Sequence, residues 1–251
     1  AVYFSPDDID IIKGQPAGRR RFVDNIIYQA RPKFYKYLQG YQRVLSQRNM
    51  LLKAIRSNPA LANTLDPWDD QLSEFGAQLM CQRLKVLEKL AGMAEEYFRE
   101  FTGSGQALKI KYNSEIEIGD LDAVKADFRK KLAACRKRDL QRSYTTVGPH
   151  RDDIDFFIDG KNVKQYGSQG QQRLVVLCLK FAQRNLLYAE TGEYPILLLD
   201  DVMSELDSHR RQLILEEEKH QVFISTTDLK LLPKSLLSNS SLYQVKAGTL
   251  R

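Results

Sequence analysis

The chain has 251 residues, of which 43% are hydrophobic and 28% charged, and its 38 Lys and Arg exceed its 32 Asp and Glu by a formal net charge of +6. This apolar content is enough to bury a core and excludes a disordered chain, while 14 Gly and 8 Pro are too few for a collagen-like or low-complexity one. Apolar runs such as residues 195–199 are far shorter than the roughly twenty residues of a membrane span. We expect a soluble protein of one or two domains with no membrane contact.

Cys81, Cys135 and Cys178 are widely separated and form no Cys-x-x-Cys pair. They are typical of buried thiols in a reducing compartment, which predicts a cytoplasmic protein. The three histidines show no metal-ligand spacing.

In chain order, residues 1–4 read as a strand already under way without an initiator Met, so we expect a piece of a longer protein. Two long helices follow, at 34–57 and from Asp69 or Asp70 to about residue 101, each with apolar residues at helical spacing. A short punctuated segment joins them, which predicts an antiparallel helical arm about 36 Å long.

The pattern changes after residue 101. The expected elements are strands at 108–112, 115–118, 154–160, 196–199 and 222–225, helices at 120–138, 171–189 and 212–219, and a polar loop at 163–170. Because strands alternate with helices in this half, we predict an α/β fold with a parallel sheet.

The charge is clustered. Residues 19–58 hold ten basic residues and one acid (+9), residues 125–151 nine and two (+7), and residues 190–208 six acids and no Lys or Arg (−6). Clustered cations interleaved with aromatics are the footprint of a nucleic-acid surface. A solvated basic face remains equally open, and we expect the aromatics to pack into the core. The DNA-binding candidates are Arg19, Arg20, Arg21, Lys33, Lys36, Arg43, Arg48, Arg136, Lys137 and Arg138.

Two acids, Asp200 and Asp201, follow four aliphatic residues that suit a central parallel strand. Ligands bind at the carboxyl edge of open α/β sheets, and paired carboxylates there can hold a divalent cation and polarise water. The alternative is a polar turn before a helix, where Asp is favoured anyway.

A second pattern precedes that strand. Residues 166–173, Tyr-Gly-Ser-Gln-Gly-Gln-Gln-Arg, open a helix whose positive end suits a phosphate, although the same turn can simply cap the helix. Ser-Glu-Leu-Asp follows the acidic strand at 204–207, and Thr-Thr-Asp follows the last strand at 226–228. This order resembles the signature, Walker B, D-loop and switch regions of an ABC-type ATPase head.

Further motifs narrow the resemblance. Phe-Ser-Pro-Asp-Asp at 4–8, Arg-Arg-Arg-Phe-Val-Asp at 19–24 and Gly-Pro-His-Arg-Asp-Asp at 148–153, together with the 167–173 run, are similar to the bacterial RecF family, which is related to SMC heads. The resemblance covers essentially the whole chain. It implies the second lobe of an ABC-ATPase-like head plus an antiparallel helical arm, divided as a strand and leading segment (1–24), the arm (25–105) and the rest of the head (106–251).

The resemblance also assigns roles. Asp200 matches the acid that holds Mg²⁺, and Asp201 stands where most ABC ATPases have a glutamate that orients the attacking water. The shorter Asp201 fits slow turnover. Ser168, Gly170 and Gln171 match the signature that contacts ATP on the opposite subunit, with Gln169 in place of the usual glycine.

Ser204, Glu205, Leu206 and Asp207 match the loop that crosses the dimer interface. Thr227 occupies the switch position, so no histidine sensor of the γ-phosphate is expected. For the whole protein, the resemblance implies an ATP-dependent homodimer that binds duplex DNA near single-strand gaps. It would help RecR and RecO to load the recombinase, with roles in DNA replication and the SOS response.

One departure is large, because no G-x-x-x-x-G-K-[ST] phosphate loop occurs in the chain. We therefore expect these residues alone to bind and hydrolyse ATP poorly. The alternatives are a non-catalytic helical-arm interaction module, whose acids only cap a helix, and a transporter-type nucleotide-binding subunit. The long arm and Thr227 disfavour the transporter.

Overall fold

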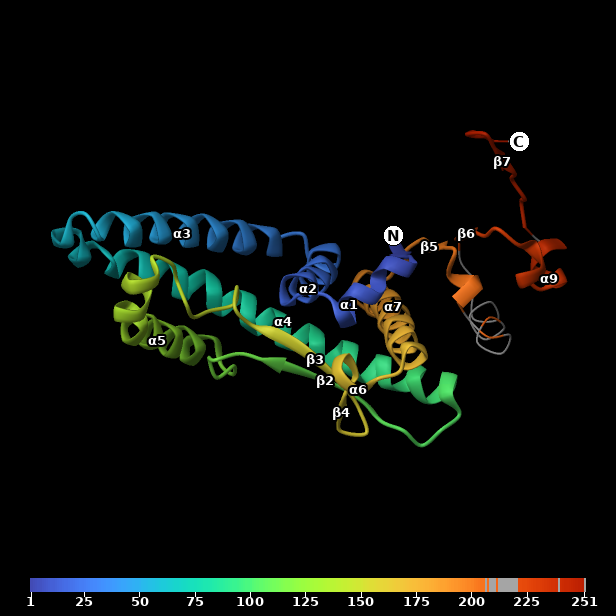
Figure 1. Cartoon of the computed structure of the whole chain (residues 1–251), viewed down its shortest axis with the longest axis horizontal. Helices are drawn as coiled ribbons and strands as arrows, with labels where there is room; N and C mark the ends of the chain where they lie inside the picture. Colours follow the sequence, from blue (N-terminus) through green and yellow to red (C-terminus); the bar gives the residue numbers. More distant parts are fainter. Residues whose placement is uncertain (206, 208–210, 212–220, 239, 251) are drawn as a thin grey trace. The chain divides into compact units, whose positions relative to one another are not determined.

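A computed structural model of the chain describes residues 1–205, 207, 211, 221–238 and 240–250. The chain forms two compact units, one made of residues 1–8 and 193–251 and the other of residues 9–192 (Figure 1). Within the described residues, every helix is too short or too polar to traverse a bilayer.

The unit of residues 1–8 and 193–251 is built on a parallel sheet. Its strands are β1 (Val2–Phe4), β5 (Leu197–Asp200) and β6 (Val222–Ser225), in the order β1-β5-β6. Tyr3 pairs with Leu198, and Asp200 pairs with Ser225. The aliphatic run therefore forms the middle strand of the three, which confirms the predicted strands and their parallel pairing.

The rest of this unit is short. It comprises the 3-10 helices η1 (Pro6–Ile9), η3 (Val202–Glu205) and η4 (Leu229–Leu231), helix α9 (Lys234–Ser238) and the hairpin β7 (Val245–Lys246) and β8 (Thr249–Leu250). The helix predicted at 212–219 lies outside the described residues.

The second unit is mainly helical. Its long helices are α2 (Pro16–Ala30), α3 (Phe34–Ile55), α4 (Asp66–Thr102), α5 (Leu121–Arg142) and α7 (Gln169–Thr191); the short ones are α1 (Asp10–Lys13), η2 (Pro59–Thr64) and α6 (Val163–Tyr166). α3 and α4 run antiparallel as the predicted arm, and in Figure 1 α4 passes between α3 and α5.

Local sequence explains where these helices begin and end. Pro67 and two early acids favour the start of α4 at Asp66, three residues before the predicted cap, and Gly103 ends it in a left-handed conformation. Asp120 caps α5 by accepting a hydrogen bond from the backbone N–H of Asp122 at 3.1 Å.

A second sheet is antiparallel. It contains β2 (Leu108–Asn113), β3 (Asp153–Ile158) and β4 (Lys161–Asn162) in the order β2-β3-β4, so the predicted parallel pairing does not extend to these strands. The segment 115–118, predicted as a strand, is irregular; its Ile116 is buried at 2% exposure, and burial of one side chain does not require strand pairing. The predicted loop 163–170 contains the one-turn helix α6 and the first turn of α7.

α4 is the central helix of this unit. It packs against α2, α3, α5, α7 and β2, and sixteen of its residues are buried. α7 is buried along most of its length, from Leu174 to Leu187. The first turn of α7, which carries the signature-like residues, is thus fixed by a well-packed helix.

Candidate functional site

Asp200 ends the middle strand of the parallel sheet, with one neighbour on each side. The Tyr3 hydroxyl, from β1, donates a hydrogen bond to Asp200 Oδ2 at 2.7 Å, and the Ser225 hydroxyl, from β6, donates to Oδ1. These hydrogen bonds, that of Ser225 first, lower the pKa of Asp200 below its usual value. The exposed Asp200 carboxylate is therefore ionised at neutral pH.

Asp201 makes the turn that ends β5. Its φ of +50° lies in the left-handed region, which aspartate tolerates better than most residues. Its backbone N–H donates to both the carbonyl and the hydroxyl of Ser225, each at 3.2 Å. Asp200 and Asp201 therefore stay adjacent at the carboxyl edge of the sheet, although their backbones turn in different directions.

The donor set at this edge fits Mg²⁺. The ion prefers hard oxygen ligands and usually takes one or two carboxylates together with phosphate oxygens and waters. Asp200 offers an ionised, exposed carboxylate here. Among the described residues, no group of three His, Cys, Asp or Glu could hold a metal on its own. The arrangement suits a cation that arrives with a nucleotide.

The remaining residues predicted in this unit are only partly described. Ser204 and Glu205 belong to η3, the exposed Asp207 follows, and Leu206 lies outside the described residues. Thr227 is exposed just beyond β6.

The first turn of α7 is closed by hydrogen bonds between its own residues. Ser168 is the N-cap: its hydroxyl accepts from the Gln171 N–H at 3.2 Å, while the Gln171 side chain accepts from the Ser168 N–H at 2.9 Å. This reciprocal capping box shows that Ser168 and Gln171 stabilise the helix in their own right. Gln169 and Gly170 are exposed beside them.

The loop before α7 is held in place by a buried side chain of the helix. The buried Gln172 side chain donates to the carbonyls of Val163 and Gly167, both at 3.1 Å. A Cβ at position 167 would lie 2.6 Å from the Val163 carbonyl oxygen, so glycine is required by the close approach. The helix end is therefore held in position, which an anion site needs.

Three of the DNA-binding candidates are committed to carboxylates. Arg48 is 0% exposed and Arg19 is 3% exposed. Arg48 donates to Asp69 at 2.7 Å and Asp139 at 2.8 Å, Arg19 pairs with Asp153 at 2.7 Å, and the less buried Arg136 pairs with Asp69 at 2.6 Å. Burial removes Arg19 and Arg48 from the DNA-binding candidates, since their guanidinium groups face no solvent, and Arg136 is already neutralised.

The other DNA-binding candidates differ in whether their side chains already have protein partners. Arg20 donates to the Asp152 carbonyl at 2.7 Å, and burial lowers its pKa. Arg138 donates to the Thr146 hydroxyl at 2.8 Å and forms a longer ion pair with Glu115 at 3.9 Å. The candidates with exposed side chains and no ion pair to a described residue are Arg21, Lys33, Lys36, Arg43 and Lys137.

The aromatics among these cations are only partly in the core. Phe34 and Tyr41 are 3% and 2% exposed, as expected. Tyr28, Tyr35 and Tyr37 are 45%, 46% and 37% exposed, so the prediction of core packing is wrong for them.

The Gly-Pro-His-Arg-Asp-Asp segment forms a loop tied to the arm. His150 Nδ1 lies 2.7 Å from the Tyr41 hydroxyl, and its Nε2 lies 3.1 Å from the Thr145 carbonyl oxygen. Gly148 has φ +123°, and a Cβ there would lie 2.5 Å from Phe128. The glycine thus lets the loop pass directly over the α5 side chains.

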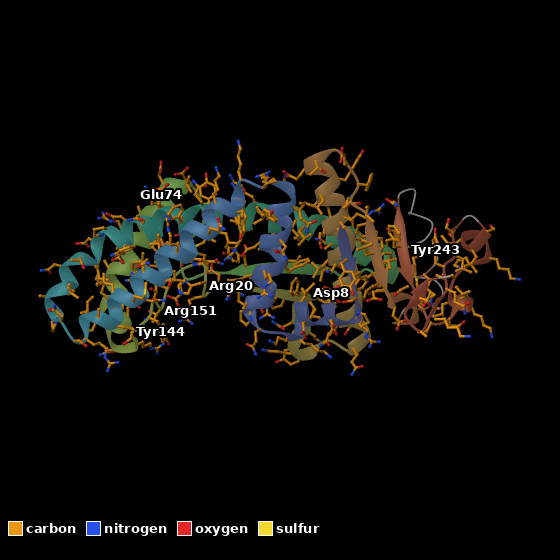
Figure 2. The ribbon with its side chains drawn as sticks, turned by 90° about the horizontal axis from the view of Figure 1, so that it is seen from above. Asp8, Arg20, Glu74, Tyr144, Arg151 and Tyr243 are labelled. Carbon is orange, nitrogen blue, oxygen red and sulfur yellow. The ribbon has the colours of Figure 1, made fainter. Side chains whose placement is uncertain are left out.

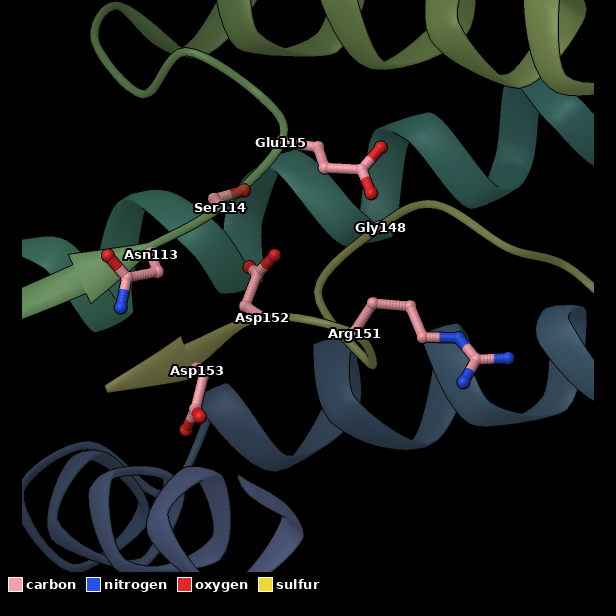
Figure 3. A pocket seen from close by; sticks show the side chains of 7 residues that line it. All are labelled: Asn113, Ser114, Glu115, Gly148, Arg151, Asp152 and Asp153. Carbon is pink, nitrogen blue, oxygen red and sulfur yellow. The ribbon is translucent and has the colours of Figure 1, made fainter. Parts of the chain in front are cut away.

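This loop also lines a small hollow of about 290 Å³, shown in Figure 3. The buried Asp152 at its edge accepts from the Tyr112 hydroxyl at 2.5 Å, and burial raises its pKa. Arg151 points away from Asp152 and stacks 4.9 Å from the centre of the Tyr144 ring; both are labelled in Figure 2. The loop is therefore a structural link between the arm and β3.

Comparison with known proteins decides the family. Over 99% of its length the chain is 40% identical to the DNA replication and repair protein RecF of Acetivibrio thermocellus, and it spans 68% of that protein. It is 43% identical over 99% of its length to RecF of Lactococcus lactis subsp. cremoris, spanning 67% of that protein. The chain belongs to the RecF family.

Solved RecF structures agree in fold. Two structures of the recombination mediator protein RecF, described as RecF-ATPrS and RecF-ATP in the RecFOR pathway, match with TM-scores of 0.89 and 0.90 at 35% and 36% identity. The chain spans 66% of each. No family model matches the chain. The predicted ABC-ATPase-like head with a parallel sheet and a helical arm is confirmed.

Two residues that contact Asp200 were missed from sequence. Tyr3 and Ser225 hold the two oxygens of Asp200, yet neither belongs to a motif that marks them. The feature that could have identified them is the pairing of β1 and β6 with β5. This pairing brings Tyr3 and Ser225 next to Asp200, although they are 197 and 25 positions away from it along the chain.

Proposed function

We propose that this chain is the signature lobe and arm of an ATP-controlled DNA-binding protein of recombinational repair. Its membership of the RecF family supports this role, as does the ATP described for its structural relatives. The observation that carries the proposal is the ionised Asp200, held between Tyr3 and Ser225 at the carboxyl edge of the sheet.

Each motif of the chain then has a task. Asp200 would hold Mg²⁺, which would neutralise phosphate charge, and Asp201 would orient the attacking water with one methylene less reach than glutamate, which favours slow hydrolysis. The first turn of α7 would offer the γ-phosphate bound by a second subunit the N–H groups of Gln169 and Gly170, which lie outside the capping box of Ser168 and Gln171. Ser204, Glu205 and Asp207 would form the dimer contact, and Thr227 would take the switch position.

Nucleotide binding needs a phosphate loop, which these 251 residues do not contain. The chain spans about two thirds of the RecF structures it matches. We propose that it hydrolyses ATP only with a lobe that supplies that loop, and that residues 1–24 and 106–251 act as head and 25–105 as arm.

The biological setting follows from the family. The relatives are named for DNA replication and repair, and their solved structures are described in the RecFOR pathway. We propose that ATP closes two copies into a homodimer that binds duplex DNA near single-strand gaps in the cytoplasm. RecO and RecR would be its partners in loading the recombinase, and hydrolysis would reopen the dimer.

The test of catalysis is Asp200→Asn in a form of the protein that includes a phosphate loop. We expect steady-state ATP hydrolysis to fall at least about tenfold, because the amide cannot replace an ionised metal ligand. Asp7→Asn, an exposed acid of the same unit, is the control. Hydrolysis at the parent rate in Asp200→Asn would refute the catalytic assignment.

The capping box favours a second candidate, a non-catalytic module in which Ser168 and Gln171 only stabilise α7. Ser168→Asp separates the two, because Asp is an equally good N-cap but repels a phosphate. If Ser168→Asp keeps its thermal stability and loses ATP-dependent dimerisation, the signature function is supported. If dimerisation is unchanged, the structural candidate is correct.

A further inference from the structure

The arm contains a long segment with basic residues and no acidic ones. From residue 25 to residue 65 there are seven Lys and Arg and no Asp or Glu. α3 lies within this run and exposes one continuous stripe, here called the outer face of α3. Its members are Tyr35, Lys36, Gln39, Gln42, Arg43, Ser46, Gln47, Met50 and Lys53. At 1.5 Å per residue, this stripe is about 27 Å long.

The cations of the outer face are available. Lys36, Arg43 and Lys53 form no ion pair with any residue that the structure describes. Because the stripe has no carboxylate of its own, its positive potential is not cancelled locally. Its other polar members are amides and a hydroxyl, which can donate hydrogen bonds to phosphate or sugar oxygens.

The second basic region behaves differently. Five basic residues of α5 pair with carboxylates: Lys125 with Glu74, Arg129 with Asp70, Lys131 with Asp127, Arg136 with Asp66 and Asp69, and Arg138 with Glu115. The two regions look alike in sequence, at +9 and +7, and α5 also keeps three exposed cations outside ion pairs to described residues, Lys130, Lys137 and Arg142. The difference is that most cations of α5 pair with carboxylates on or beside that helix, whereas α3 carries no Asp or Glu.

The outer face ends in aromatic rings. Tyr35 on α3 and Tyr28 on α2 lie 5.4 Å apart, centre to centre, at an interplanar angle of 50°, and nearly half of each residue is exposed. Lys33 is exposed between them in sequence. Exposed rings beside cations are the elements with which proteins hold unpaired bases, because every base has a face that can stack.

We propose that the outer face of α3, together with Tyr28, binds single-stranded DNA. Lys36, Arg43 and Lys53 neutralise its phosphates, and Tyr28 and Tyr35 stack on its bases. The inference rests on the proposed DNA-binding function and adds the surface and the type of strand. A duplex hides its base faces, so it can use the cations of this surface but not the tyrosine rings.

The phosphate contacts are tested by fluorescence anisotropy with a labelled oligothymidylate over a range of salt concentrations. Lys36→Glu/Arg43→Glu should weaken binding and make the slope of log affinity against log salt shallower by about 1.4 units, the value for two lost single-strand contacts. Lys130→Glu/Arg142→Glu, two exposed cations of α5 that are not DNA-binding candidates, makes the same change in net charge. This control should leave the slope unchanged.

The stacking contacts are tested with the same oligonucleotide and a hairpin duplex. Tyr28→Ala/Tyr35→Ala should weaken binding to the single strand about tenfold or more and leave duplex binding within about twofold. Tyr28→Phe/Tyr35→Phe should bind as the parent does, because the ring is kept. Tyr243→Ala, another exposed tyrosine, is the control. Unchanged thermal unfolding of each variant shows that the exposed substitutions leave the fold intact.

The outcomes separate the two proposals. If the parent binds neither DNA, the proposed DNA-binding function itself fails. If the parent binds but the α3 and α5 charge variants weaken it equally, the surface is wrong. If the charge variants behave as expected and the tyrosine variants do not, the surface binds backbone only and the single-strand assignment is wrong. Parent-like binding in every variant would leave the outer face of α3 for a protein partner.

Discussion

Arg48 is the most informative residue for stability, because it is fully buried between two buried acids. Its Nε lies 2.7 Å from Asp69 and its Nη1 lies 2.8 Å from Asp139, whose side chains are 1% and 0% exposed. In Arg48→Met, Asp69 keeps Arg136 at 2.6 Å, whereas Asp139 keeps only the N–H and hydroxyl of Thr146. One buried carboxylate thus loses its counter-charge.

The expected loss of stability in Arg48→Met follows from this one unpaired carboxylate. Removing one partner of a buried ion pair costs about 3–5 kcal/mol. For a chain of this size that is a fall in Tm of roughly 6–10 °C. Urea unfolding followed by circular dichroism measures the loss directly. Arg99→Met, which removes an exposed pair with Glu95 on α4, should cost less than about 0.5 kcal/mol.

A second substitution tests the cause. Adding Asp139→Asn to Arg48→Met removes the unpaired charge but not its hydrogen bonds with Thr146, so at least about 1 kcal/mol should be regained. If Arg48→Met costs less than about 1 kcal/mol, or if Asp139→Asn makes the double variant less stable still, the electrostatic reasoning is wrong.

Three further predictions concern other sites. Gly148→Ala should lower the free energy of unfolding, measured in urea, by about 2–4 kcal/mol, because a Cβ would meet an aromatic ring at 2.5 Å and φ is +123°. Gly92→Ala, in an open part of α4, should instead raise it by about 0.5–1 kcal/mol. Burial lowers the pKa of His150 to about 4; the unfolded chain takes up that proton first, so stability falls below about pH 6.5, by about 2 kcal/mol at pH 5. Tyr3→Phe should raise the pKa of Asp200 toward its usual value, measured by NMR titration of the carboxyl carbon.

Each of these three predictions can be contradicted by a specific result. Equal stability of the two glycine variants would mean that the loop relaxes around the new methyl group. Because Asp152 has a raised pKa, it opposes the His150 effect, so the parent is compared with His150→Gln, whose stability should depend less on pH. The histidine assignment fails if the two pH profiles are parallel. An unchanged Asp200 titration in Tyr3→Phe would show that Ser225 alone sets that pKa.

What could be predicted from sequence was the local pattern. Four aliphatic residues before Asp200 indicated a buried parallel strand, and the apolar spacing of 34–57 and 69–101 indicated the helical pair; both are present. Alternation alone was not enough at 115–118, since one buried isoleucine can anchor an irregular segment as well as a strand.

What could not be predicted depends on contacts between distant residues. Arg48 and Lys53 look alike as cations of one basic helix, but only the packing of α3 against α4 and α5 shows that Arg48 is buried and Lys53 exposed. The pairing of Tyr3 with Asp200 likewise requires the order of the strands. Charge counts therefore located the basic regions but not the cations that are free to bind.

The length of α4 has a mechanical consequence. Its 37 residues form one uninterrupted helix, about 55 Å long, that packs against α7 and also against α3 and α5. A rotation of about 5° at one end displaces the other end by about 5 Å if the helix stays straight. A tilt of α7 that rotated α4 by about 5° would therefore move the tip of the arm by about one helical turn.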